Sequence, residues 1–205
     1  MGPMARVGSV DTRLVIIRGN SGSGKTTIAR LLREAVPDLA IISLDVLRRD
    51  ILGIRDVADN PSIALIDLVA RFALTQQRPV VIEGILNAPR YGEMLRTLAA
   101  DHRGVTRTYV LDVPFEETLR RHSTKPKASE FGEVEMRAWW HGLQLVDGLD
   151  ETLLGSDLSA HDAASKILDE CGLGPAVPGA PALAPSDTGQ RCDRPRSWPL
   201  SGPRS

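Results

Sequence analysis

Residues 14–32 read LVIIRGNSGSGKTTIARLL and carry the most specific signal in the chain. The stretch opens with an apolar run at 14–17, which is typical of a buried parallel strand. Residues 19–26 then match GxxxxGKS/T, the phosphate-binding loop, and helical spacing follows until Pro37. A strand before the loop and a helix after it are the context that this loop requires, so the chain is predicted to bind a triphosphate.

The loop residues are predicted to hold ATP or another nucleoside triphosphate. Glycines let backbone N–H groups wrap around phosphate oxygens, and the helix that follows adds positive potential at the same point. Lys25 is expected to reach the β- and γ-phosphates, and Thr26 to offer its hydroxyl to Mg²⁺. The predicted nucleotide-binding residues are Gly19, Asn20, Ser21, Gly22, Ser23, Gly24, Lys25, Thr26 and Thr27.

Composition indicates one ordinary globular domain. The chain has 205 residues and a net charge of −1, so a general attraction to nucleic acid or to an anionic membrane is not expected. Its apolar runs are far shorter than the roughly 20 residues of a membrane span. Cys171 and Cys192 form neither a disulfide framework nor a zinc site. These features favour a cytoplasmic protein.

Strand-like and helix-like segments alternate along the chain. Strands are predicted at 14–17, 39–45, 79–86, 106–113 and 151–157, with helices at 25–36, 62–76, 91–102, 114–122, 133–141 and 159–171. This alternation predicts a parallel sheet with helices on both faces. Residues 1–12 are interpreted as a flexible leader and 13–172 as the domain. Residues 173–205, rich in Pro, Gly, Ala and Arg, are interpreted as a disordered tail.

In such a sheet, ligands bind at the carboxyl ends of the strands, so the residues after each strand are candidates. Asp45 ends the second predicted strand and could accept the proton of an attacking hydroxyl. Arg48, three residues later, could contact the γ-phosphate or an acidic substrate. The alternative is that Asp45 only caps a helix and that Arg48 and Arg49 are solvated surface residues. Asp50 lies deeper in the expected helix and is the less attractive carboxylate.

Glu83 lies near the end of the third predicted strand, where an acidic residue in this fold commonly holds a Mg²⁺-bound water. Asn87, Arg90 and Tyr91 follow in a predicted connecting loop and could line the acceptor pocket. The alternative for these three residues is an ordinary loop and helix start.

After the fourth predicted strand, a helix carries Arg120 and Arg121 and leads into a charged, irregular segment. A cationic lid at about 120–142 would neutralise charge on the transferring phosphoryl group and expel water. Its further cations are Lys125, Lys127 and Arg137. The alternative is a solvated helix, because nearby acids nearly balance this charge: Glu130, Glu133 and Glu135.

Trp139 and Trp140 are neighbours on the short helix expected near 133–141, so at most one can face the core squarely. The other could stack on a base or cover the lid hinge. The four histidines show no metal-ligand spacing, and none is assigned to catalysis.

The chain resembles the P-loop kinase group that includes gluconate and shikimate kinases, chloramphenicol phosphotransferase, zeta-type toxin kinases and polynucleotide 5′-kinases. The resemblance covers about 13–172 and is carried by GNSGSGKTT, SLDVLRRD and the lid position of Arg120 and Arg121. It implies an α/β P-loop NTPase fold of the nucleoside and small-molecule kinase type. That fold is a three-layer sandwich with a five-stranded parallel sheet and a lid.

The resemblance also implies roles for individual residues. Asp45 matches the proposed base of chloramphenicol phosphotransferase and zeta-type kinases, while the spacing of Asp45 and Arg48 resembles polynucleotide kinases. Glu83 stands where the group usually has Asp.

These features predict an ATP- and Mg²⁺-dependent kinase that phosphorylates a hydroxyl group of a small molecule, with antibiotic or nucleoside-like acceptors suggested by the resemblance. The catalytic candidates are Lys25, Asp45, Arg48, Arg120 and Arg121. One alternative is a polynucleotide 5′-hydroxyl kinase, against which the net charge argues mildly. A second alternative is a nucleotide-binding switch with slow hydrolysis and a protein partner.

Overall fold

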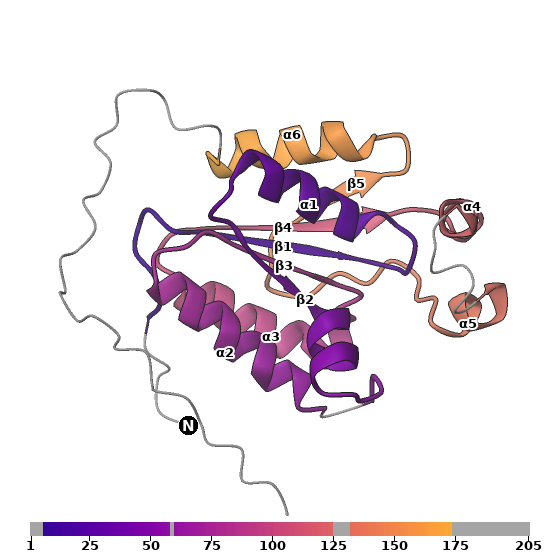
Figure 1. The fold of residues 1–205 in the computed structure, drawn as a ribbon, viewed down its shortest axis with the longest axis horizontal. Coiled ribbons are helices and arrows are strands. Elements are labelled where there is room, and N and C mark those ends of the chain that lie inside the picture. Colours follow the sequence, from indigo (N-terminus) through magenta and orange to yellow (C-terminus); the bar gives the residue numbers. More distant parts are fainter. Residues whose placement is uncertain (1–5, 58–59, 125–131, 174–205) are drawn as a thin grey trace, which may run out of the picture. The chain divides into compact units, whose positions relative to one another are not determined.

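The computed structural model describes residues 6–57, 60–124 and 132–173 (Figure 1). Five strands form one sheet in the order β2-β3-β1-β4-β5, and every neighbouring pair is parallel. The strands are β1 (Arg13–Gly19), β2 (Ala40–Ser43), β3 (Val80–Gly84), β4 (Val105–Asp112) and β5 (Glu151–Gly155). The predicted five-stranded parallel sheet is therefore confirmed.

Helices cover both faces of the sheet, as the alternating pattern predicts (Figure 1). The helices α1 (Lys25–Ala35) and α6 (Ala160–Cys171) pack on one face, and α2 (Ser62–Thr75) and α3 (Ala88–Asp101) pack on the other. Along β1, Leu14 and Ile16 face α2 and α3, while Val15 and Ile17 face α1 and α6. Both sets are fully buried, which is why the strand reads as a continuous apolar run.

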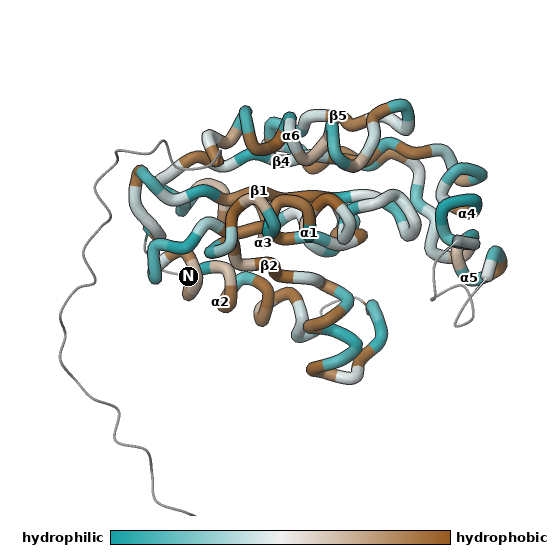
Figure 2. The backbone as a smooth tube through the Cα atoms, turned by 45° about the horizontal axis from the view of Figure 1, so that its top comes forward, coloured by the Kyte–Doolittle hydropathy of each residue, from teal (hydrophilic) through white to brown (hydrophobic). Residues whose placement is uncertain are grey.

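Hydropathy differs between the central strands of the sheet and the helix that follows β4. Figure 2 shows hydrophobic residues along the central strands, whereas α4 (Phe115–Ser123) is largely hydrophilic. The short helix α5 (Glu133–Ala138) is the remaining α-helix of the described residues. No helix within these residues is long and apolar enough to cross a membrane.

The helix ends follow recognisable local chemistry. Ser159 caps α6, since its Oγ accepts a hydrogen bond from the Asp162 N–H at 3.1 Å. After β2 the chain forms a π-helix, η1 (Val46–Ile51), where the sequence suggests the start of an ordinary helix. The helix α3 begins at Ala88 rather than residue 91, because Asn87 caps it. The predicted loop for Arg90 and Tyr91 is therefore wrong.

The described part of the predicted leader packs against the domain. Val7 is buried in the core, and its N–H donates to the Asp101 carbonyl at 3.0 Å. Thr12 is also buried and its hydroxyl lies 2.9 Å from His102 Nε2. The expectation of a flexible leader is thus wrong for residues 7–12. The predicted tail lies outside the described residues, apart from Leu173.

A buried ion pair joins the carboxyl end of β1 to the first residue of β5. Arg18 Nη1 lies 2.5 Å from Glu151 Oε1, and both side chains are almost fully buried. Arg18 also donates to the carbonyls of Leu86, at 2.9 Å, and Gln144, at 3.1 Å. The Glu151 carboxylate in turn accepts the Val146 N–H. A buried pair needs such additional hydrogen bonds to offset its desolvation, and here they fix the chain that follows α5.

Candidate functional site

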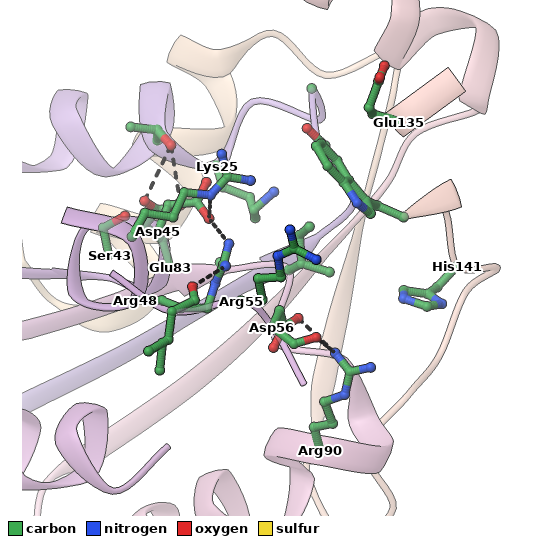
Figure 3. A pocket seen from close by; sticks show the side chains of 18 of the residues that line it. Lys25, Ser43, Asp45, Arg48, Arg55, Asp56, Glu83, Arg90, Glu135 and His141 are labelled. Atoms are coloured by element: carbon green, nitrogen blue, oxygen red, sulfur yellow. Dashed lines mark hydrogen bonds and ion pairs between the residues drawn. The ribbon is translucent and has the colours of Figure 1, made fainter. Parts of the chain in front are cut away.

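A cleft of about 950 Å³ lies at the carboxyl ends of β1, β2 and β3. Its walls come from the P-loop, the start of η1, the segment 53–57, the end of β3, the start of α3, and α5 (Figure 3). This is the position at which parallel α/β sheets bind ligands, and the volume is large enough for nucleotide phosphates and a small second substrate.

The P-loop connects β1 to α1 and packs closely against α4. Gly22 has a positive φ of 79°, and a Cβ at this position would lie only 2.6 Å from the Thr118 carbonyl oxygen. Glycine is therefore required there by both backbone conformation and space. Lys25 and Thr26 line the cleft, and the Lys25 ammonium donates to the Asn20 carbonyl at 2.7 Å. Of the nine predicted phosphate-binding residues, four line the cleft at a helix N-terminus: Ser21, Gly22, Lys25 and Thr26.

Thr26 and Glu83 meet at the floor of the cleft. The Thr26 Oγ1 lies 3.3 Å from each carboxylate oxygen of Glu83, and Glu83 is buried. A hydroxyl beside a carboxylate offers the hard oxygen ligands that Mg²⁺ prefers. The described residues hold no cluster of three or more His, Cys, Asp or Glu side chains suited to a metal. One or two protein oxygens are sufficient for Mg²⁺, which takes its other ligands from water and phosphates.

Asp45 lies on the same cleft, at the start of η1. Its Oδ1 accepts from Arg48 Nη2 at 3.2 Å and lies 3.5 Å from Arg49 Nε, and the Asp45 side chain remains 52% exposed. Although Asp45 occupies the N-cap position, its side chain makes no capping hydrogen bond. The alternative that Asp45 only caps a helix is therefore wrong.

Arg48 is not a solvated surface residue, because its side chain is only 10% exposed. Besides Asp45, it donates to the Ile54 carbonyl at 3.0 Å, which anchors the segment 53–57. Its buried Nε has no hydrogen-bond partner among the described residues. Asp45 and Arg48 both line the cleft, whereas Asp50 does not.

The three residues predicted to line an acceptor pocket take different positions. Asn87 accepts a hydrogen bond from the Arg90 N–H at 3.1 Å and serves as the cap of α3. Tyr91 is fully buried in the core, and its hydroxyl donates to Asp56 Oδ1 at 2.8 Å. Burial raises the pKa of the Tyr91 phenol. Of these three residues, Arg90 lines the large cleft, and it pairs with Asp56 Oδ2 at 2.9 Å.

Arg120 and Arg121 differ sharply in their surroundings. Arg120 is 70% exposed and binds Glu117 through two hydrogen bonds of 2.7 and 2.8 Å. Arg121 donates to Glu117 at 2.6 Å, to the Ser23 carbonyl of the P-loop at 3.0 Å and to the Ser156 carbonyl at 3.0 Å. Hydrogen bonds from Arg120 and Arg121 lower the pKa of Glu117 to about 2. Neither arginine lines the cleft, and Arg121 braces the P-loop from outside it.

Of the remaining lid cations, Arg137 belongs to the described residues, and it does not line the cleft. Lys125 and Lys127 lie outside those residues. Arg137 pairs with Glu133 at 2.8 Å, and its guanidinium carbon lies 4.3 Å from the centroid of the Phe115 ring. This position does not support a role for Arg137 in neutralising charge on the transferring phosphoryl group.

On the side of the cleft next to α5, the aromatic side chain of Trp139 lies where a lid cation is expected. Trp139 lines the cleft, and the Arg49 guanidinium carbon lies 5.6 Å from its ring centroid. Trp140 instead packs edge-to-face on Phe115, with ring centroids 5.3 Å apart. The helix expected near 133–141 ends at Ala138, so both tryptophans follow it, and the sequence does not predict which ring enters the cleft.

Asn20 joins the P-loop to the chain that follows this wall. Its Nδ2 donates to the His141 carbonyl at 2.7 Å, and its Oδ1 accepts from the His141 N–H at 3.1 Å. Both partners are backbone groups, so no residue pattern in the sequence reveals the contact. Sequence reasoning also missed several cleft-lining side chains: Arg49, Arg55, Asp56, His122, Glu135 and His141.

Three solved kinases are similar to the chain in fold. For the APS kinase of Mycobacterium tuberculosis with AMPPNP and APS, the TM-score is 0.61 at 20% identity, covering 78% of this chain and 96% of that one. For a sugar kinase from Janibacter sp. HTCC2649, the TM-score is 0.59 at 21% identity, covering 80% of this chain and 97% of that one. For a gluconokinase from Sinorhizobium meliloti 1021, the TM-score is 0.54 at 16% identity, covering 82% of this chain and 94% of that one. The predicted P-loop kinase fold is therefore confirmed.

Sequence comparison adds a family. No curated protein matches the chain in sequence. A family model described as an AAA domain, AAA_33, matches residues 14–149. Because this match covers well over half of the chain, including the P-loop, Asp45 and Glu83, the protein belongs to that AAA domain family.

Proposed function

We propose that this protein is an ATP-dependent kinase that transfers the γ-phosphoryl group to a hydroxyl group of a small molecule. The observation that carries the proposal is that Lys25, Thr26 and Asp45 line one cleft. A triphosphate on the P-loop and a carboxylate base could therefore meet the same acceptor hydroxyl. The similarity in fold to three proteins named as kinases supports this reaction class.

In this reaction the acceptor oxygen bonds to the γ-phosphorus, and the bond from that phosphorus to the β–γ bridging oxygen breaks. Asp45 takes the hydroxyl proton or orients it, and ADP leaves with the bridging oxygen. Lys25 and the P-loop N–H groups hold the phosphates, while Arg48 stabilises charge on the transferring group. Positioning and electrostatics supply most of the catalysis in phosphoryl transfer, so these few groups are sufficient.

The residues at the cleft floor fit a magnesium ion. Thr26 Oγ1 and the Glu83 carboxylate would hold it, directly or through water. When bound, Mg²⁺ neutralises charge on the β- and γ-phosphates. Glu is longer than the Asp usual at this position, but its carboxylate reaches the Thr26 hydroxyl all the same.

A phosphoryl-transfer screen tests the proposal. The protein is incubated with ATP and Mg²⁺ and with hydroxyl compounds, nucleosides or oligonucleotides bearing 5′-hydroxyls, and products are identified by mass spectrometry. The expected result is one acceptor class that gains a phosphoryl group with equal formation of ADP. Phosphorylated oligonucleotide ends would favour the polynucleotide kinase alternative. Slow ADP formation that no acceptor accelerates would contradict a kinase and favour the nucleotide-binding switch.

Arg121 and Arg120 provide a matched pair of variants. Arg121→Ala removes the hydrogen bond to the Ser23 carbonyl, so we expect weaker ATP binding, by roughly tenfold for a lost charged hydrogen bond. Arg120→Ala removes an exposed ion pair with Glu117 and is expected to change ATP affinity less than twofold, because exposed ion pairs are screened by solvent and contribute little. Isothermal titration of both variants with AMPPNP measures the difference. Equal effects would contradict the role of Arg121 as a brace.

A further inference from the structure

We propose that the phosphate acceptor is an anion: a hydroxyl compound that also carries a phosphate, sulfate or carboxylate group, which Arg55 and its neighbouring arginines bind. This inference rests on the proposed function, because it names the class of acceptor for the same cleft. It follows from the space beside Asp45, the charges that line that space, and the surroundings of Arg55.

The position of the acceptor follows from the phosphate site. With a triphosphate on the P-loop, an acceptor hydroxyl must lie close to Asp45 to be deprotonated. The rest of the acceptor then occupies the part of the cleft away from the P-loop. That part is lined by the segment 53–57, by Arg90 of α3 and by Trp139 beyond α5.

Arginines are more numerous than carboxylates on this side of the cleft. Four of them line it: Arg48, Arg49, Arg55 and Arg90. Arg48 and Arg49 share the single carboxylate of Asp45, and Arg90 pairs with Asp56. The Glu135 carboxylate also lines the cleft, but it accepts the Gly132 N–H at 2.9 Å and so caps α5. The local charge is therefore positive before any ligand binds.

Arg55 is the arginine whose charge is left without a carboxylate. Among the described residues its side chain makes neither a hydrogen bond nor an ion pair, and it is exposed and lines the cleft. In Figure 3 its side chain extends into the middle of the cleft, between the Asp45–Arg48 pair and the Asp56–Arg90 pair. A guanidinium fork in this position matches the two oxygens of a carboxylate, sulfate or phosphate.

The segment that carries Arg55 is held in place by other contacts. Arg48 donates to the Ile54 carbonyl at 3.0 Å, and Arg90 Nη1 donates to the Asp56 carbonyl at 3.0 Å. Tyr91 holds the Asp56 carboxylate as well. The residues on either side of Arg55 are therefore anchored while its own side chain is left to bind a ligand, which is the arrangement of a preorganised binding group.

The partly buried Arg48 strengthens the same field. Its Nε has no partner in the described part of the chain, so one carboxylate and one carbonyl satisfy only part of the guanidinium. A neutral acceptor would leave several like charges close together in a concave site of reduced dielectric. An oxyanion would offset that repulsion. The Trp139 ring on the facing wall could cover the uncharged part of the acceptor.

Matched acceptors and variants test this inference. Transfer from ATP is measured for hydroxyl compounds in charged and neutral pairs: a sugar acid and its sugar, a hydroxy acid and its amide, a nucleoside monophosphate and its nucleoside. The variants are Arg55→Gln, Arg55→Lys and the control Arg30→Gln, an exposed arginine on α1 outside the cleft. Thermal unfolding checks that all variants are folded.

We expect the charged acceptor of each pair to be phosphorylated. The KM for that acceptor should rise roughly 10- to 100-fold in Arg55→Gln, because the variant loses a charged hydrogen bond to it. Arg55→Lys should recover part of this loss, and Arg30→Gln should match the wild type. Turnover restricted to neutral members, or a KM for the charged acceptor that Arg55→Gln leaves unchanged, would overturn the inference.

A binding measurement separates this inference from the proposed function. With AMPPNP saturating the P-loop, titration with inorganic sulfate should show a site that Arg55→Gln weakens and Arg30→Gln does not. If no acceptor is phosphorylated yet sulfate binding depends on Arg55, the kinase proposal fails and the anion site stands. Sulfate binding that is absent from the wild type, or equal in both variants, would overturn the anion site.

Discussion

Lys25→Ala is expected to abolish nucleotide-dependent phosphoryl transfer. The Lys25 side chain is buried beside the P-loop and lines the cleft, where its ammonium would contact the β- and γ-phosphates. Alanine removes both the charge and the donor, and no other lysine among the described residues lines the cleft. The measurement is ADP and phosphorylated product formed by the wild type and the variant under saturating ATP.

Lys166→Ala is the matched control. Lys166 is partly exposed on α6 and pairs with Glu170 at 2.6 Å, outside the cleft. Its loss should leave transfer unchanged. If Lys25→Ala retains turnover comparable to that of Lys166→Ala, the assignment of the phosphate site to the P-loop is wrong, and the kinase proposal loses its main support.

Asp45→Asn is expected to cut phosphoryl transfer by roughly 10²–10⁴-fold, the usual range for loss of a general base, while ATP binding stays nearly intact. Asparagine keeps the shape of the side chain and can still accept the hydrogen bond from Arg48. It cannot take the proton of the acceptor hydroxyl. Single-turnover transfer and AMPPNP titration measure the two effects separately.

Asp50→Asn is the control for this substitution. Asp50 belongs to η1 as well, but it is exposed and does not line the cleft. Unchanged transfer is expected there. Should Asp45→Asn abolish AMPPNP binding instead of transfer, Asp45 would serve the metal rather than the acceptor, and the proposed role of Asp45 as a base would be wrong.

Local patterns account for what could be predicted. The P-loop motif depends on residues next to one another in the chain, and the strands read as apolar runs because both faces of the sheet are covered. Parallel strands bring their carboxyl ends together, which makes Asp45 and Glu83 candidates from the sequence, and both line the cleft. The prediction of a loop around Arg90 is wrong because Asn87 caps a helix that already begins at Ala88.

Neighbouring residues with similar chemistry could not be told apart in advance. Arg120 and Arg121 have the same side chain, and Trp139 and Trp140 do too. Arg120 and Arg121 lie about 100° apart around α4, and Trp139 and Trp140 follow the end of α5, so packing of the whole segment decides which member of each pair faces the site. Arg121 reaches Ser23 and Ser156 because α4 lies against the P-loop, and Trp139 enters the cleft because Trp140 packs on Phe115.

The sequence by itself determined the parallel sheet, the phosphate-binding loop and the two strand-end carboxylates, since these depend on spacing along the chain. Tertiary structure alone decided which side chains surround the acceptor space. Arg55 lies in the middle of the cleft only because Arg48 and Arg90 hold the carbonyls on either side of it. Those contacts join η1, the segment 53–57 and α3, and a contact between distant elements leaves no periodicity or motif in the sequence.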